Sequence, residues 1–270
     1  MFGGELFNRR YVLQILFYIL VCLAATTAGG ISGIGGGVII KPVLDAVSDM
    51  PVETISFLSG CTVLAMSVSS MISGRNDTVN VEKRRGTALA IGAVLGGILG
   101  KSMFQTIAVV GCKAVVVTQQ SMMMVLTLLV LVYTLNRSRI PTKNIRQLPG
   151  CCCVGLLLGI LSSFLGIGGG PINLMVLYYF FSMDTKAAAL NSLYIILFSQ
   201  TASLANTVFT RSIPAFDLTV LLVMVASGIL GGRLGRKLSR MLSSRQMDIL
   251  FLILLVVITL ISGYNLIRAC

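Results

Sequence analysis

The chain has 270 residues, of which 56% are hydrophobic and only 11% are charged, and its mean hydropathy is +0.93. Soluble domains carry roughly 25% charged residues, so this composition excludes an ordinary soluble globular protein. The formal net charge of +12 comes from Lys and Arg in short stretches between apolar runs. That placement is typical of cytoplasmic loops in membrane proteins and argues against a nucleic-acid partner.

Ten apolar segments follow one another along the chain. We expect five in the first half, at 11–30, 38–47, 53–73, 86–107 and 117–136, and five in the second, at 149–165, 171–182, 186–210, 216–234 and 246–266. A helix needs about 20 residues to cross a bilayer, so the short segments 38–47 and 171–182 are expected to be broken or re-entrant helices. The predicted fold class is therefore all-α, a polytopic transmembrane helical bundle.

The five-residue string GIGGG occurs at Gly33–Gly37 and again at Gly166–Gly170, each time inside apolar sequence. Sliding the second half over the first with an offset of 133 aligns both strings and gives eleven identities in the 37 positions between Leu23 and Ser59. This ordered series predicts an internal duplication. We divide the chain into a first transmembrane repeat at 1–136, a basic cytoplasmic linker at 137–149, and a second transmembrane repeat at 150–270.

The basic residues decide between two topologies. If each short segment only completes a broken span, the halves lie parallel and the stretch 233–245, with five basic residues, lies outside. If each short segment crosses back, the halves are inverted and the stretches 83–85, 137–146 and 233–245 are all cytoplasmic. In the inverted arrangement only two basic residues, Arg9 and Arg10, lie on the non-cytoplasmic side. The parallel arrangement places five there, so the inverted arrangement agrees better with the preference of basic residues for the cytoplasmic side. We therefore predict an inverted repeat.

The glycine strings have the properties of an anion-binding backbone. Glycine adopts positive φ without a steric penalty, and successive exposed N–H groups can point into one concavity. The helix expected after each string adds free N–H groups and the positive end of its dipole. Paired helix breaks at matching positions of two halves point to a transport site. Close helix packing through small residues is the competing explanation.

Polar side chains accompany the two breaks. Ser59 and Ser192 occupy matching positions of the repeats, and Asn191 lies beside the second of them. Lys41 follows the first break and is an intramembrane cation, which would suit an anionic substrate. The predicted substrate-binding residues are therefore Gly33, Gly35, Gly36, Gly37, Lys41, Ser59, Gly166, Gly168, Gly169, Gly170, Asn191 and Ser192.

The sequence offers little for catalysis. It contains no His, and its nine carboxylates lie near the ends of the apolar segments. No acid–base pair or metal cluster can be assembled from these residues, so we expect neither an enzyme nor a metal site or cofactor. A dinucleotide-binding fingerprint would need a preceding strand and a βαβ unit, which the membrane-length apolar flanks exclude.

At its doubled G-x-G-G-G break, Pro42, Ser59 and Ser192, the chain resembles the TauE/SafE family of sulfite and organosulfonate transporters. The resemblance implies a permease for a small anion, such as sulfite, an organosulfonate or a related carboxylate. A channel or transporter of another solute, including a cation, is the alternative. The expected location is the plasma membrane, with multiple spans, and the expected partners are the anion and the lipid bilayer. A homo-oligomer stays open.

Overall fold

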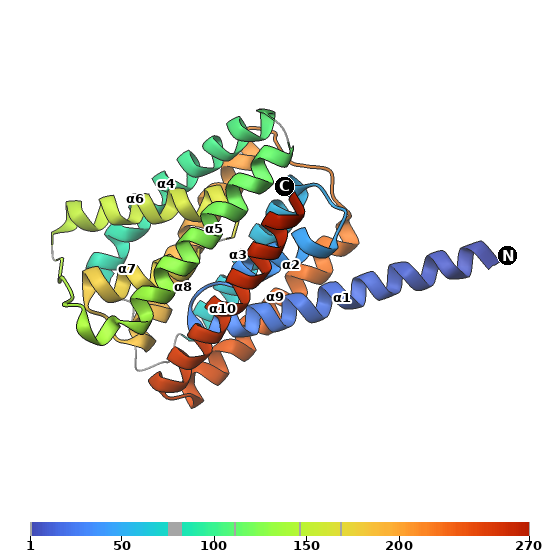
Figure 1. Cartoon of the computed structure of the whole chain (residues 1–270). Helices are drawn as coiled ribbons and strands as arrows, with labels where there is room; N and C mark the ends of the chain where they lie inside the picture. The colour runs from blue at the N-terminus through green and yellow to red at the C-terminus, as the bar shows by residue number, and fades with distance from the viewer. Residues whose placement is uncertain (1, 75–82, 111, 146, 168, 270) are drawn as a thin grey trace.

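The computed structural model describes the chain except residues 1, 75–82, 111, 146, 168 and 270 (Figure 1). The described residues form ten α-helices and one short 3-10 turn at Arg137–Arg139. The helices are α1 (Phe2–Ser32), α2 (Gly37–Val47), α3 (Val52–Ser73), α4 (Lys83–Val110), α5 (Cys112–Leu135), α6 (Leu148–Leu165), α7 (Pro171–Phe181), α8 (Thr185–Phe209), α9 (Leu218–Met241) and α10 (Ser244–Ala269).

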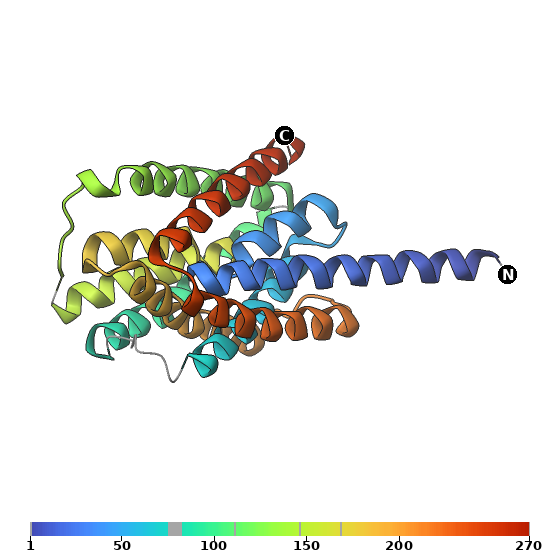
Figure 2. The same cartoon turned by 90° about the horizontal axis from the view of Figure 1, so that it is seen from below.

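Eight of these helices are long and apolar enough to cross a membrane. The other two are α2 and α7, which have 11 residues each and follow the two glycine strings. The prediction of an all-α polytopic bundle with two short segments is thus confirmed. The N-terminal part of α1 extends well beyond the other helices (Figures 1 and 2).

The two halves are interlocked rather than side by side. Helix α4 of the first half packs along α6 of the second, and α9 of the second half packs along α1 of the first. Likewise α3 packs against α9, and α8 packs against α4, while α5 pairs with α10. Helices α1–α5 correspond in order to α6–α10. If each helix is replaced by its counterpart, the α4–α6 pair becomes α9–α1, the α3–α9 pair becomes α8–α4, and the α5–α10 pair is unchanged. The inverted orientation of the halves relative to a bilayer remains a prediction.

Glycines bring the paired helices into backbone contact. A methyl group built on Gly96 of α4 would lie 2.1 Å from the carbonyl oxygen of Leu156 in α6. One built on Gly155 of α6 would lie 2.1 Å from the carbonyl oxygen of Leu89 in α4. Small residues at intervals of four let membrane helices approach in this way, since lipid provides no hydrophobic force between them.

One end of the bundle gathers basic stretches. Arg137, in the linker between the halves, lies 3.7 Å from the Asp248 carboxylate at the start of α10. Asp248 also accepts a hydrogen bond of 2.9 Å from Thr185 at the start of α8. Arg240, near the end of α9, donates to the Ser73 carbonyl at the end of α3. The linker and the ends of α3 and α9 therefore share one end of the bundle.

At the opposite end, Tyr11 of α1 and Thr54 of α3 contact the loop between α8 and α9. The Tyr11 hydroxyl donates to the Asp217 carboxylate at 2.9 Å, and the Thr54 hydroxyl donates to the Ala215 carbonyl at 3.0 Å. The hydrogen bonds from Tyr11 and from the Thr219 amide lower the pKa of the Asp217 carboxyl. Residues from α1, α3 and the loop before α9 thus close this end together.

One predicted boundary is wrong. The sequence placed the end of the ninth segment at residue 234 and a basic loop at 233–245, whereas α9 continues to Met241. Positive side chains near a helix C-terminus interact favourably with its dipole, so basic residues there extend the helix rather than end it. Arg236 within this stretch is buried.

Candidate functional site at the two glycine breaks

The first break turns the chain back on itself after α1. Gly33 and Gly35 have φ angles of +80° and +85°, which favour glycine over other residues. Gly36 has φ −66°, an ordinary value, so glycine is needed there for a different reason. A methyl group on Gly36 would lie 2.7 Å from the Thr26 side chain of α1. The first break therefore combines positive φ with close packing.

The second break follows the same scheme. Gly166 ends α6 in the left-handed conformation, with φ +65°, and its N–H donates to the Ser163 carbonyl at 3.2 Å. Gly169 has φ +117°, and a methyl group there would lie 2.3 Å from the Ile196 side chain. Gly170 then precedes α7, which begins at Pro171. Gly168 lies outside the described residues.

Each break lies against the third helix of the other half. The Ser192 hydroxyl of α8 donates to the Gly33 carbonyl at 2.6 Å. A methyl group on Gly33 would lie 2.4 Å from the Ala189 backbone of α8, and one on Gly166 would lie 2.8 Å from the Ser56 hydroxyl of α3. Ser56 and Ala189 are 133 positions apart, as are the two glycines. The Ser192 hydroxyl thus positions the first break through its hydrogen bond to the Gly33 carbonyl.

The two breaks meet inside the bundle. A methyl group on Gly37, the first residue of α2, would lie 2.2 Å from the carbonyl oxygen of Ile167. One on Gly170, just before α7, would lie 3.7 Å from the Val38 side chain. The starts of α2 and α7 are therefore close to each other. Because a helix start carries roughly half a positive charge, both short helices present positive dipole ends to this region.

Both breaks contain amide groups without a hydrogen-bond partner. Within the described part of the chain no acceptor is bonded to the backbone N–H groups of Gly35, Gly36, Gly37, Val38, Gly169 and Gly170. All six residues are buried. Buried backbone N–H groups are nearly always paired in native proteins, because leaving one unpaired is costly. These amides are therefore buried donors for which the described part of the chain supplies no acceptor.

Buried side chains near the breaks have unused hydrogen-bonding capacity as well. The Ser59 hydroxyl is fully buried, and it has no partner among the described residues. Asn191 donates to the Ala187 carbonyl of its own helix, which leaves its Oδ1 without a donor. The sequence did not single out Asn173, which is 1% exposed and whose two amide atoms have no hydrogen-bond partner among the residues that the structure describes. A methyl group on Gly169 would lie 3.2 Å from its Nδ2.

Position alone could have found Asn173. It is a polar residue in the first turn of α7, two residues after Pro171, in a segment that is otherwise apolar. The sequence interpretation relied on matching pairs of residues in the repeats, and the first repeat has Ile40 at this position. A residue present in one half only was therefore overlooked.

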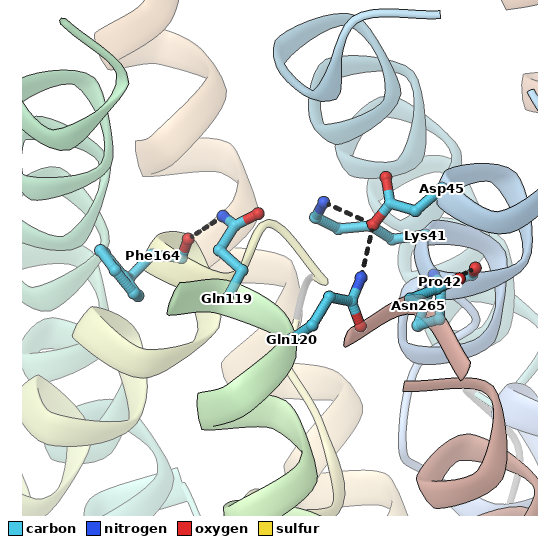
Figure 3. A network of polar contacts seen from close by, with 7 residues as sticks. All are labelled: Lys41, Pro42, Asp45, Gln119, Gln120, Phe164 and Asn265. Carbon is cyan, nitrogen blue, oxygen red and sulfur yellow. Dashed lines mark hydrogen bonds and ion pairs between the residues drawn. The ribbon is translucent and has the colours of Figure 1, made fainter. Parts of the chain in front are cut away.

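Lys41 is part of a buried network of polar side chains and is not an isolated charge (Figure 3). Its Nζ is 3.0 Å from Oδ2 of Asp45, and both side chains are nearly inaccessible, at 3% and 4% exposure. Gln120 of α5 donates to the same carboxylate oxygen at 2.8 Å. The spacing of four residues on one helix gives this pairing directly. Lys41 is thus neutralised by Asp45, and its stem passes Gly166, with Cε 3.5 Å from a methyl group built there.

Neighbouring amides tie the network to other helices (Figure 3). Asn265 of α10 donates to the Pro42 carbonyl at 2.8 Å, and Gln119 of α5 donates to the Phe164 carbonyl at 2.7 Å. Gln119 and Gln120 are adjacent on α5 but point to different partners, one at the end of α6 and the other on α2. Helices α5 and α10 therefore fix the helices on either side of the breaks.

This polytopic bundle, with two short helices starting at facing breaks inside it, has the architecture of a membrane transporter. Residues 18–261 match the model of the family described as sulfite exporter TauE/SafE. The chain therefore belongs to the TauE/SafE family, as its doubled motif predicted, and is a multi-pass integral membrane protein. Comparison with curated proteins and comparison with solved structures gave no match.

Proposed function

We propose that the protein is a permease for a small anion, such as sulfite, an organosulfonate or a related carboxylate, which it binds where the two glycine breaks meet. The observation that carries this proposal is the set of buried amide N–H groups at both breaks that have no partner among the described residues. An anion can accept several of these bonds at once. It also lies at the positive ends of α2 and α7, where negative charge is stabilised.

The charges around the breaks favour an anion over a cation. N–H groups cannot coordinate a cation, which needs carbonyl oxygens or carboxylates. Asp45 is the carboxylate next to the first break, and both Lys41 and Gln120 already bind its Oδ2. The breaks thus combine free donors with a carboxylate whose charge is paired at Oδ2, while its Oδ1 has no partner among the described residues. Family membership supports the same class of substrate, since the family is described by sulfite export.

The location of the breaks supports transport rather than static binding. The two short helices α2 and α7 start at the breaks, and the first break is held by a hydrogen bond from Ser192 of the other half. Movement of one half against the other would therefore change both breaks together. Alternating access in transporters with paired broken helices works through such movement around a fixed site.

Asn173 gives the sharpest test, because its side chain makes no hydrogen bond within the described part of the chain. Replacing a buried amide that makes no hydrogen bond is close to neutral for folding, so Asn173→Leu should keep the melting temperature of the wild type. If its amide binds the anion, the same substitution should lower transport about tenfold, as for the loss of a hydrogen bond to a charged group. Uptake of sulfite or ethanesulfonate into proteoliposomes measures the effect.

Asn265→Leu is the matched control, since Asn265 is a buried asparagine that does make a hydrogen bond, to Pro42. It should lower the melting temperature, with a smaller change in transport per folded molecule. Proteoliposomes that take up none of these anions would refute the proposal. Wild-type transport by Asn173→Leu would remove this residue from the site.

A further inference from the structure

A groove runs along the second half of α5, which lies at the edge of the bundle (Figure 2). Its volume is about 570 Å³, and binding sites for small molecules measure roughly 300–1,000 Å³. This α5 groove is lined by Leu128, Leu129, Val132, Tyr133, Asn136 and Ile140. Leu129 and Val132 are 49% and 60% exposed within a candidate membrane span, so the groove opens toward lipid.

The α5 groove is apolar along the helix and polar where the helix ends. Its apolar part consists of Leu128, Leu129 and Val132, whereas Asn136 follows the last residue of α5. Tyr133 lies in the last turn of α5, and its hydroxyl has no hydrogen-bond partner among the described residues. Tyr is enriched where the hydrocarbon core meets the lipid head groups. The groove therefore extends from the hydrocarbon region to the membrane surface.

The polar end of the groove carries positive charge. Arg137, the residue after Asn136, lies 3.7 Å from the Asp248 carboxylate, and its guanidinium is 3.6 Å from the centroid of the Tyr178 ring. The charge of Arg137 is therefore paired. Arg139, which precedes Ile140 of the groove, is exposed and forms no ion pair within the described part of the chain.

Lys143 adds a second unpaired charge at the same place. Its backbone N–H donates to the Tyr179 carbonyl at 2.7 Å, and the Tyr179 ring packs edge-on against Tyr133 with 6.1 Å between the ring centroids. The Lys143 side chain is exposed, and among the described residues it has no carboxylate partner. No carboxylate belongs to the described lining of the groove. Basic residues at this depth attract anionic lipid head groups.

The apolar part of the groove does not suit a second protein helix. Membrane helices approach each other through small residues, because lipid provides no hydrophobic force between them. Helices α4 and α6 pack in this way through Gly96 and Gly155, but α5 contains no glycine. A flexible acyl chain needs no such close backbone approach, so it fits a wall of Leu and Val better than a helix does.

We propose that the α5 groove binds an anionic phospholipid of the bilayer, with an acyl chain against Leu128, Leu129 and Val132 and its phosphate beside Arg139 and Lys143. The bound lipid connects α5 with the linker between the two halves. The proposal does not depend on the proposed permease function, since the groove shares no residue with either glycine break.

Native mass spectrometry of the full chain in detergent measures lipid binding and oligomeric state together. Dioleoyl phosphatidylglycerol should bind the wild type about tenfold more tightly than dioleoyl phosphatidylcholine, which has the same chains but no net charge. Arg139→Gln/Lys143→Gln should remove most of this preference. Arg233→Gln/Lys237→Gln, which removes two exposed charges from α9, is the matched control and should keep it.

Val132→Trp tests the apolar part of the groove. Val132 is exposed, so the larger side chain fills the groove without disturbing the core, and phosphatidylglycerol should bind about fivefold more weakly or worse. Val125→Trp is the control, because Val125 is 63% exposed on the same helix but does not line the groove. If Val132→Trp does not fold, Leu129→Trp is the second variant, with the same expected result.

Equal affinity of the wild type for the two lipids would overturn the proposal. Unchanged binding in Arg139→Gln/Lys143→Gln or in the groove-filling variant would do the same, as would an equal loss in the control variants. A wild-type dimer that Val132→Trp dissociates would assign the groove to a second copy of the chain instead. Glycerol 3-phosphate, which has the phosphate without the chains, should not displace the lipid; displacement at equal concentration would overturn the role of the acyl chain.

Discussion

A methyl group on Gly37 tests whether contact between the two breaks is needed for transport. In Gly37→Ala the new carbon would lie 2.2 Å from the Ile167 carbonyl oxygen and 2.8 Å from a methyl group of Val63. Real side chains essentially never approach closer than 3.0 Å in this way, so the backbones must separate by about 0.8 Å. The φ angle of Gly37 is not positive, so backbone strain does not contribute.

The size of the effect follows from this overlap. Overpacking of a well-packed interior costs about 1–3 kcal/mol, and here the contact is with backbone, which moves less freely than a side chain. A loss of that size lowers the melting temperature of a chain this long by about 2–10 °C. Since about 1.4 kcal/mol corresponds to a factor of ten in affinity, anion binding at the separated breaks should weaken about tenfold.

Gly263→Ala is the control, because a methyl group there meets nothing within 4 Å. It should match or exceed the wild-type melting temperature, since alanine is the better helix former. The assay is sulfite or ethanesulfonate uptake into proteoliposomes, normalised to folded protein, with thermal melting in parallel. Wild-type melting and uptake in Gly37→Ala would refute the direct contact of the breaks and the reasoning built on it.

Three further predictions concern the ends of the bundle and its buried charges. Single cysteines in place of Ser243 and Ala215, in a cysteine-free background, should be labelled from opposite sides of the membrane, Ser243 from the cytoplasm; labelling from one side would contradict the arrangement of the ends. Lys41→Met should lower stability by about 3–5 kcal/mol, and Lys41→Met/Asp45→Leu should recover most of it in melting experiments; an unaffected single variant would show that the pair is not buried. Tyr11→Phe should lower the melting temperature at pH 7. Its partner carboxyl has a lowered pKa in the folded state, so the contribution exists above the unfolded pKa of about 3.9 and is lost as the pH falls through the folded value. A difference that persists at a pH low enough to protonate the Asp217 carboxyl in the folded state would argue against this bond.

Much of the fold could be predicted because apolar length and glycine position determine it. The starts and ends of most helices follow from runs of about 20 apolar residues, and the short helices follow from the glycine strings. The predicted end of α9 was wrong because Arg and Lys were taken as markers of a loop. The pairing of Lys41 with Asp45 was visible at a spacing of four residues, but its burial against Gln120 of α5 was not.

The candidate site was harder to predict, since packing between the halves assembles it. Ser192 was identified, yet its hydroxyl is bonded to a carbonyl of the first break, which no local pattern indicates. Repeat matching did not indicate Asn173, because the first repeat has Ile40 at the corresponding position.

The interlocking of the halves has a consequence for biogenesis. Gly96 of α4 can reach its partner backbone only after α6 has been synthesised, and Gly30 of α1 contacts Gly235 of α9, about 200 residues later. The first five helices therefore enter the bilayer with their closest-packing surfaces facing lipid. Helix α1 gains its main partner, α9 (Leu218–Met241), only when the ribosome has nearly finished the chain. A break in translation after residue 136 should leave a fragment that quality-control proteases remove, and co-synthesis of the two halves as separate chains should rescue both.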